Sequence, residues 1–236
     1  MNTKTHAGHK AEKIGEPSLQ FEKNYFSGRK YRSKETLVKR NVLEVVKWAS
    51  RVSGRDFLRG TGKKALDVGC AYGFASAVLS SLGYETFGVD VSKWGVRKAK
   101  AASDGSFVVC DAQALLPFKA ESFDLVTCFD VLEHLRFPEM AIRNMLESSK
   151  DALICTTPNR NVEKPVRKIM RDFDETHVSA KSSSEWKKSI REVVDRESVN
   201  VETFFDVTAK LANTRVLFKS VKLPRFGLTV RILVRK

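Results

Sequence analysis

Residues 65–83 read ALDVGCAYGFASAVLSSLG, and this stretch decides the fold class. It opens with a short apolar run that contains Asp67, passes through Gly69 and Gly73, and continues as a helix-like run of Ala, Ser, Val and Leu. A buried strand, a glycine turn and a helix in this order form the first part of a βαβ unit. The stretch therefore predicts an α/β domain with a ligand at the turn, where both glycines would let a ligand approach the backbone.

Strands and helices alternate along the residues that follow. Five strand-like apolar runs lie between residues 64 and 158, separated by helix-like segments. This alternation predicts right-handed βαβ units and a mostly parallel sheet. Two later strands, at 198–207 and 228–236, complete the expected fold: a three-layer, doubly wound, mostly parallel seven-stranded sheet whose last strand is antiparallel.

The chain is expected to divide into three segments. Residues 1–20 are polar and are expected to form a flexible tail. Residues 21–63 are expected to form a helical segment that acts as a lid, with a helix ending at Gly54. Residues 64–236 are expected to form the ligand-binding domain.

A later amphipathic helix follows a long polar connection. Its inward positions are Trp186, Ile190, Val193 and Val194, and Ser184 is the expected N-cap.

The bulk composition limits the classes of protein. The net charge is +14, but residues 64–158 carry 9 basic and 12 acidic residues, so the excess lies in the flanks. No apolar run approaches the ~20 residues of a membrane span, and we expect a soluble cytoplasmic protein. The four cysteines form no C-x-x-C pair, so no metal site is expected.

Acidic residues follow the strands at the edge of the sheet where ligands bind. They are Asp67, Asp90, Asp111 and Asp130. The turn lacks both the lysine of a P-loop and the G-x-G-x-x-G spacing of a dinucleotide site. A ring of carboxylates suits a ligand that carries hydroxyls, amines and positive charge: Asp90 is suited to ribose hydroxyls, Asp111 to an adenine amine and Asp67 to an ammonium group. The alternative is that these acids only cap helices and turns.

The pattern resembles the class I S-adenosylmethionine-dependent methyltransferases, and within them the type 11 methyltransferase domain group. The resemblance rests on LDVGCAYG (66–73), FGVDVS (87–92), VVCDAQALLPF (108–118), FDLVTCFDVLEHL (123–135) and ALICTTPN (152–159). It implies the Rossmann-like methyltransferase fold and S-adenosyl-L-methionine as cofactor, and it departs from the family at Ala71, where glycine is common. The cofactor-binding residues it implies are Asp67, Gly69, Cys70, Gly73, Asp90, Val91, Asp111, Ala112, Phe129 and Asp130.

The sequence says less about the acceptor of the methyl group than about the cofactor. Candidate catalytic bases are His134 and His177, and Tyr25 is a candidate lid residue; structural roles for all three remain as alternatives. The motifs for methylation of an exocyclic amine and of cytosine C5 are both missing from the sequence. We expect a small-molecule or lipid-like acceptor. RNA bound by the basic flanks is the alternative, as is a non-catalytic cofactor-binding partner subunit, and the oligomeric state stays open.

Overall fold

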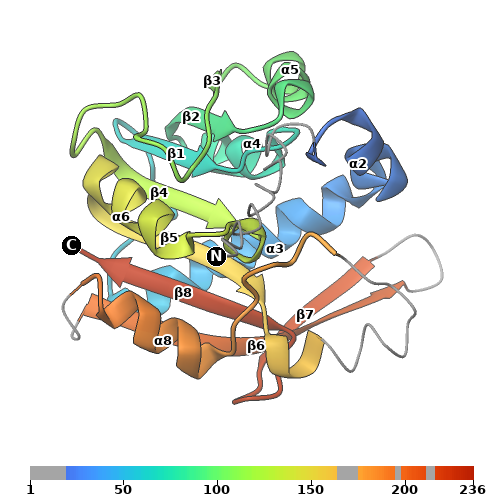
Figure 1. Cartoon of the computed structure of the whole chain (residues 1–236), viewed down its shortest axis with the longest axis vertical. Coiled ribbons are helices and arrows are strands. Elements are labelled where there is room, and N and C mark those ends of the chain that lie inside the picture. The colour runs from blue at the N-terminus through green and yellow to red at the C-terminus, as the bar shows by residue number, and fades with distance from the viewer. Residues whose placement is uncertain (1–19, 164–174, 195–197, 211–215) are drawn as a thin grey trace, which may run out of the picture.

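The computed structural model describes residues 20–163, 175–194, 198–210 and 216–236. Within these ranges eight strands form one sheet in the order β3-β2-β1-β4-β5-β8-β6-β7 (Figure 1). The predicted flexible tail lies outside the described residues, except for Gln20. The strands are β1 (Lys64–Val68), β2 (Glu85–Asp90), β3 (Ser106–Val109), β4 (Phe123–Phe129), β5 (Ser149–Pro158), β6 (Val199–Lys210), β7 (Val216–Lys222) and β8 (Thr229–Arg235).

The direction of the strands matches the expected mostly parallel sheet. β1, β2, β3, β4 and β5 pair in parallel, whereas β8 pairs antiparallel with both β5 and β6. The strand count differs from the expected seven, because β7 pairs antiparallel with the far side of β6. The sequence of β7, with Lys219 and Lys222 among its apolar residues, did not indicate a strand because this strand lies at an edge of the sheet.

Helices cover both faces of the sheet and give the expected three layers (Figure 1). α3 and α4 share one core with residues of β1, β4, β5 and β8, and the opposite core joins the other face of these strands to α6 and α8. α5 packs against β2 and β3. The helices are α2 (Lys23–Gly28), η1 (Tyr31–Lys34), α3 (Glu35–Ser53), α4 (Phe74–Ser81), α5 (Lys93–Ala102), η2 (Leu132–His134), α6 (Pro138–Ser148) and α8 (Ser183–Arg191).

The helix expected before the first strand is α3, and it ends where the sequence predicts. Val45, Val46 and Ala49 are fully buried on its inner face. Gly54 follows the helix in the left-handed region, at φ +71°, and its N–H donates to the carbonyl of Ser50 over 3.0 Å. Glycine is favoured there because this conformation costs other residues free energy.

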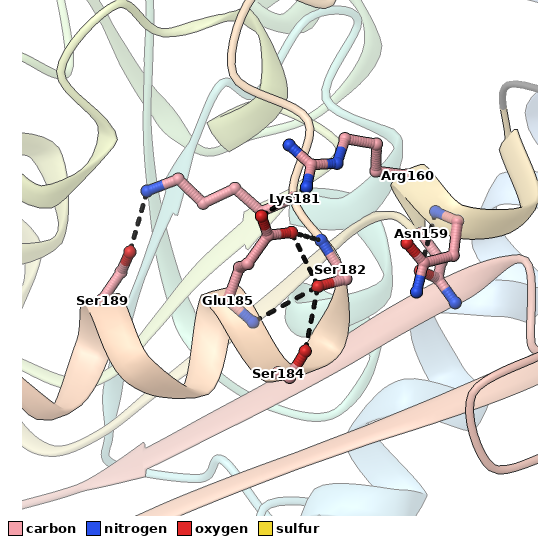
Figure 2. A network of polar contacts seen from close by, with 8 residues as sticks. Asn159, Arg160, Lys181, Ser182, Ser184, Glu185 and Ser189 are labelled. Carbon is pink, nitrogen blue, oxygen red and sulfur yellow. Dashed lines mark hydrogen bonds and ion pairs between the residues drawn. The ribbon is translucent and has the colours of Figure 1, made fainter.

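The predicted late helix is α8, but its N-cap is Ser182 and not Ser184 (Figure 2). The N–H of Glu185 donates to Ser182 Oγ over 3.3 Å, and the N–H of Ser182 donates to Glu185 Oε2 over 2.8 Å. This reciprocal capping box explains the choice of serine, because only Ser182 lies three residues before a glutamate in that run. Trp186 and Ile190 are fully buried, as predicted.

The order of the sheet fixes the position of a ligand site. β1 has β2 on one side and β4 on the other, so the strand order reverses at β1. Ligands of open α/β sheets bind outside the carboxyl ends of the strands at such a switch point. Among the described helices, none is long and apolar enough to span a membrane.

Candidate functional site

A cavity of about 750 Å³ lies at the carboxyl ends of the central strands. Its walls come from the turns after β1, β2 and β4, from η2, and from the N-terminal elements α2 and η1. All predicted site residues line it except Gly73. Those that line it are Tyr25, Asp67, Gly69, Cys70, Asp90, Val91, Asp111, Ala112, Phe129, Asp130, His134 and His177.

The two glycines of the turn serve packing within the protein. Gly69 has φ +78°, and a Cβ atom there would lie 2.1 Å from Val131 Cγ2. Gly73, at φ +76°, lies at the start of α4, where a Cβ would be 3.2 Å from Ala99 Cβ. The missing side chains therefore leave room for Val131 and Ala99, and both glycines also supply the positive φ, while Gly69 still lines the cavity.

Ala71 occupies the position where the resemblance predicts glycine. Its φ is +46°, in the left-handed region, where a Cβ atom crowds the following carbonyl. Its N–H donates to Asp90 Oδ2 over 2.8 Å. The turn therefore keeps a glycine-like conformation, and a hydrogen bond from the end of β2 helps to hold it.

Asp90 is the last residue of β2 and is 9% exposed. Oδ2 accepts from the N–H of Ala71, and Oδ1 accepts from the N–H of Ser92 over 2.8 Å. Burial raises the pKa of Asp90, and these two hydrogen bonds oppose the rise. The carboxylate is thus fixed in orientation at the cavity wall, and each oxygen retains a lone pair for a further donor.

Asp67 lies one strand away, beneath the glycine turn, and is 1% exposed. Ser76 Oγ–H donates to its Oδ2 over 2.7 Å, and Thr127 Oγ1–H lies 3.3 Å from its Oδ1. Burial raises the pKa of Asp67 to about 6. A cationic group in the cavity would favour the ionised form of this carboxyl.

Asp111 follows β3 and is half-buried. Its Oδ1 accepts from the backbone N–H of Gln113 over 2.9 Å. The side chain of Gln113 accepts in turn from the N–H of Phe137 over 2.8 Å, which ties this loop to the start of α6. Asp111 therefore shapes its own loop while it faces the cavity.

Asp130 follows β4 with φ +53°. Its N–H donates to the carbonyl of Thr156 over 3.0 Å, and its Oδ1 accepts from Thr156 Oγ over 2.9 Å. Burial raises its pKa, and the charge of His177 opposes the rise. The ends of β4 and β5 are therefore joined at the cavity.

The two predicted histidines meet on one wall of the cavity. Their ring centroids are 4.6 Å apart, although the rings come from η2 and from the connection before α8. His134 Nδ1 lies 2.8 Å from Thr176 Oγ1, and His177 Nδ1 lies 2.5 Å from an oxygen of Glu163. Beside them Glu133 is 1% exposed, and burial raises its pKa well above the ordinary value.

Aromatic side chains from the N-terminal elements cover the same cavity. The ring of Tyr25, in α2, lies 6.4 Å from the ring of His134. Phe26 packs on Tyr72, and Tyr31 stacks on Phe74 with centroids 5.3 Å apart. Residues between 20 and 38 thus contribute part of the cavity wall, and the lid role expected for residues 21–63 stays a prediction.

Tyr31, Glu133 and Glu163 were not among the predicted site residues. Burial and the nearby charges of Asp67 and Asp90 raise the pKa of Tyr31. The sequence offered a weak signal for Glu133, which directly precedes His134. It offered none for Tyr31, in a basic segment, or for Glu163, in a polar connection.

The central part of the chain is similar to a known family of domains. Residues 66–151 match the family described as "Methyltransferase domain". This confirms the resemblance to the type 11 methyltransferase domain over the stretch that carries the strand-end acids.

The relatives found by sequence match this chain over only part of their own length. The "Ubiquinone biosynthesis O-methyltransferase" of Azoarcus sp. (strain BH72) is 34% identical over 107 residues, which is 42% of this chain and 46% of that protein. The protein of the same name from Hahella chejuensis (strain KCTC 2396) is 31% identical over 137 residues, 55% of this chain and 58% of that one. The chain thus spans about half the length of the relatives it matches.

Solved structures show the same fold at low identity. A "SAM dependent methyltransferase" from Archaeoglobus fulgidus matches with a TM-score of 0.65 at 17% identity, covering 91% of this chain and 100% of that one. The magnesium protoporphyrin IX methyltransferase from Synechocystis PCC 6803 with bound SAH matches with a TM-score of 0.57 at 20% identity, covering 84% and 83%. The expected Rossmann-like methyltransferase fold is confirmed.

Proposed function

We propose that this chain, whose residues 66–151 match the methyltransferase domain, transfers a methyl group from S-adenosylmethionine to an oxygen of a small acceptor. The observation that carries the proposal is Asp90, a buried carboxylate oriented by two backbone N–H groups at the end of β2, inside the cavity. A fixed pair of acceptor oxygens suits the two neighbouring hydroxyls of a ribose.

The other acids fit the rest of the cofactor. Asp67, held under the turn after β1, would favour the ammonium of the amino-acid part, and Asp111 after β3 would accept from the adenine amine. Phe129, Val91, Cys70 and Ala112 line the space between these acids. When bound, the sulfonium supplies an electrophilic methyl group, and its carbon–sulfur bond breaks with the electron pair remaining on sulfur.

The protein has to align the acceptor, exclude water and remove a proton. Alignment alone can supply ~7–11 kcal/mol of the barrier. The acceptor oxygen forms the new bond to the methyl carbon, and its proton passes to the ring of His134 or His177, which line the cavity. Tyr25 and the aromatic residues around it cover the cavity and reduce its contact with water.

A small acceptor is favoured over RNA. The cavity wall carries many apolar and aromatic side chains, among them Phe21, Tyr25 and Leu135, beside the cations Arg29, Lys34 and Arg136. Such a lining suits a small, partly apolar molecule. The two relatives described above are both named as O-methyltransferases. We also propose a cytoplasmic location.

Binding of S-adenosylhomocysteine, measured by calorimetry, tests the cofactor assignment. Asp90→Ala and Asp90→Asn should each abolish or strongly weaken binding, whereas Asp104→Ala, which removes an exposed acid, should not. Thermal unfolding of each variant shows whether the fold is retained. Undiminished binding by a folded Asp90→Ala protein would contradict the ribose assignment.

The base is tested by turnover with phenolic and other hydroxyl acceptors. A lost general base should slow transfer by ~10²–10⁴-fold in His177→Gln, with S-adenosylhomocysteine affinity unchanged. Raising the pH should recover part of the lost rate, because the acceptor then ionises without help. Full turnover in this variant would remove His177 from the reaction. Steep salt dependence of binding to RNA, with no turnover of small acceptors, would favour RNA instead.

A further inference from the structure

Three groups that bind metal ions meet at the wall of the cavity. They are Glu133 and His134 in η2 and His177 in the connection before α8, and one ligand atom from each lies within 4.8 Å of the other two. His134 Nε2 is 4.0 Å from Glu133 Oε1. All three residues line the cavity that we assign to the cofactor and the acceptor.

Both rings are held from behind through Nδ1. His134 Nδ1 contacts Thr176 Oγ1 at 2.8 Å and the carbonyl of Thr176 at 3.2 Å. His177 Nδ1 contacts Glu163 Oε1 at 2.5 Å, and both members of this pair are about 10% exposed. Histidines that bind metals through Nε2 are oriented in this way, by a carbonyl or a carboxylate on the other ring nitrogen.

Glu133 provides an independent observation. Its side chain is 1% exposed, and within the described part of the chain neither its buried Oε2 nor the buried Oγ1 of the nearby Thr157 forms a hydrogen bond, although Thr157 is close enough to lower the pKa of Glu133 in part. A buried carboxylate oxygen without a partner is costly, and such groups in native proteins are normally paired or coordinate a metal. No Lys or Arg side chain forms an ion pair with Glu133 in the described ranges, where its Oε1 lies 4.0 Å from His134 Nε2 and the acids Asp130 and Glu163 lie nearby.

We propose that Glu133, His134 and His177 bind a divalent first-row transition metal ion, with Zn²⁺ as the best match. Two imidazoles and one carboxylate suit such ions, whereas Mg²⁺ prefers a set of oxygen ligands. In a tetrahedral zinc site with bonds of about 2.1 Å, neighbouring ligand atoms lie about 3.4 Å apart. The ligand atoms of the three residues lie within 4.8 Å of one another, and those of His134 and Glu133 are 4.0 Å apart, so the side chains have to rotate toward one another to close the site.

The site has three protein ligands, which is the number that leaves a position for substrate or water. That position faces the cavity, because the three residues line it. This step rests on the proposed methyl transfer but takes the place of a histidine base, because both rings would be bound to the ion. The ion would bind the acceptor hydroxyl and lower its pKa, so that its proton leaves to solvent, and would hold the oxygen for attack on the methyl carbon. Glu163 and Thr176 are then positioning residues, which act through His177 and His134.

Metal binding can be measured on the full chain without cofactor or acceptor. The protein is treated with a chelator, dialysed, and titrated calorimetrically with ZnCl₂ alone and with MgCl₂ alone. We expect one equivalent of Zn²⁺ in the wild-type protein and weaker binding of Mg²⁺. Co²⁺ in place of Zn²⁺ should give visible absorption bands typical of low-coordinate nitrogen and oxygen ligation.

The chain offers a matched control, because it has four histidines. The double variant His134→Gln/His177→Gln should lose the equivalent of Zn²⁺, and His6→Gln/His9→Gln, which removes the same number of imidazoles, should keep it. Thr176→Val and Glu163→Gln should weaken binding ~10–100-fold, which tests the site even if the double variant does not fold.

Two results would overturn the proposal: unchanged Zn²⁺ binding in the folded His134→Gln/His177→Gln protein, or loss of the equivalent in the His6→Gln/His9→Gln protein. Preference for Mg²⁺ over Zn²⁺ would also contradict it. Titration with S-adenosylhomocysteine on the metal-free protein separates the two proposals. If that ligand binds and Zn²⁺ does not, the metal site is wrong while the proposed function stands.

Discussion

Substitution of Gly69 by alanine tests the packing of the turn that defines the site. The new Cβ would lie 2.1 Å from Val131 Cγ2, at a backbone φ of +78°. The positive φ costs an L-residue ~1–2 kcal/mol, and forcing a methyl into a packed region costs ~1–3 kcal/mol more. The smaller entropy of the unfolded alanine chain returns ~0.4–1 kcal/mol. We expect Gly69→Ala to destabilise the protein by about 2–4 kcal/mol.

Gly62 provides the matched control for the backbone term. Its φ is +75°, almost the same as that of Gly69, but a Cβ there would meet no atom within 4 Å. Gly62→Ala should therefore cost only the conformational part, about 1 kcal/mol. Urea unfolding followed by circular dichroism gives both values, provided that the slope with denaturant is unchanged.

A double variant separates the two terms at Gly69 itself. Val131→Ala removes the Cγ2 atom that the new methyl would strike, so Gly69→Ala should be cheaper in that background by ~1–3 kcal/mol. The same clash should displace Val131 into the cavity and weaken S-adenosylhomocysteine binding, since Val131 lines it. If Gly69→Ala costs no more than Gly62→Ala, then Val131 does not fill this space and the reasoning is refuted.

Further predictions concern the same edge of the sheet. Ala71→Gly should raise the free energy of unfolding by about 0.5–1 kcal/mol, as measured by urea unfolding. Glycine removes the strain of an alanine at φ +46°, and the greater entropy of glycine in the unfolded chain offsets part of this gain. The affinity for S-adenosylhomocysteine should rise as pH increases through about 6 and then level off, and calorimetry measures it. The reason is that burial raises the pKa of Asp67 to about 6, while the ammonium of the ligand favours the carboxylate. In Asp67→Asn this rise should be reduced. Without ligand the sign is opposite: the folded protein binds that proton more tightly than the unfolded chain, so this contribution to stability is full below pH ~4 and is lost as pH increases through about 6.

The parts of the fold that the sequence predicts are those encoded by local patterns. Short, largely apolar runs such as KALDV at 64–68 indicate strands buried on both faces, and Gly54 marks a helix end by its own backbone preference. Acids placed directly after strands must reach one edge of a parallel sheet. For this reason the residues that line the cavity include nearly all of those predicted.

The features that the sequence does not reveal depend on the path of the chain in space. β7 becomes a strand because β6 offers it an edge, and its lysines hide the pattern. Glu163, shortly after β5, and His177, shortly before α8, are in contact although they stand apart in the sequence, and no local pattern predicts this pairing. Gly69 is a similar case, because a side chain there would strike Val131, which follows β4 and is distant in the sequence.

A count of lone pairs shows that the structural role of Asp90 is compatible with the ligand-binding role that we propose for it. Asp90 uses one acceptor direction of each oxygen on the protein, for the N–H groups of Ala71 and Ser92. A carboxylate has about four such directions, so two remain for a ligand. The two structural hydrogen bonds leave these directions available. They also fix the orientation of the Asp90 side chain, so that a ligand does not have to order it on binding. An asparagine at 90 retains only one of the two acceptor atoms, so Asp90→Asn should disturb both the turn at Ala71 and the bound ribose. If the Asp90→Asn protein loses S-adenosylhomocysteine binding but stays folded, the effect is assigned to the two acceptor directions that remain for the ligand.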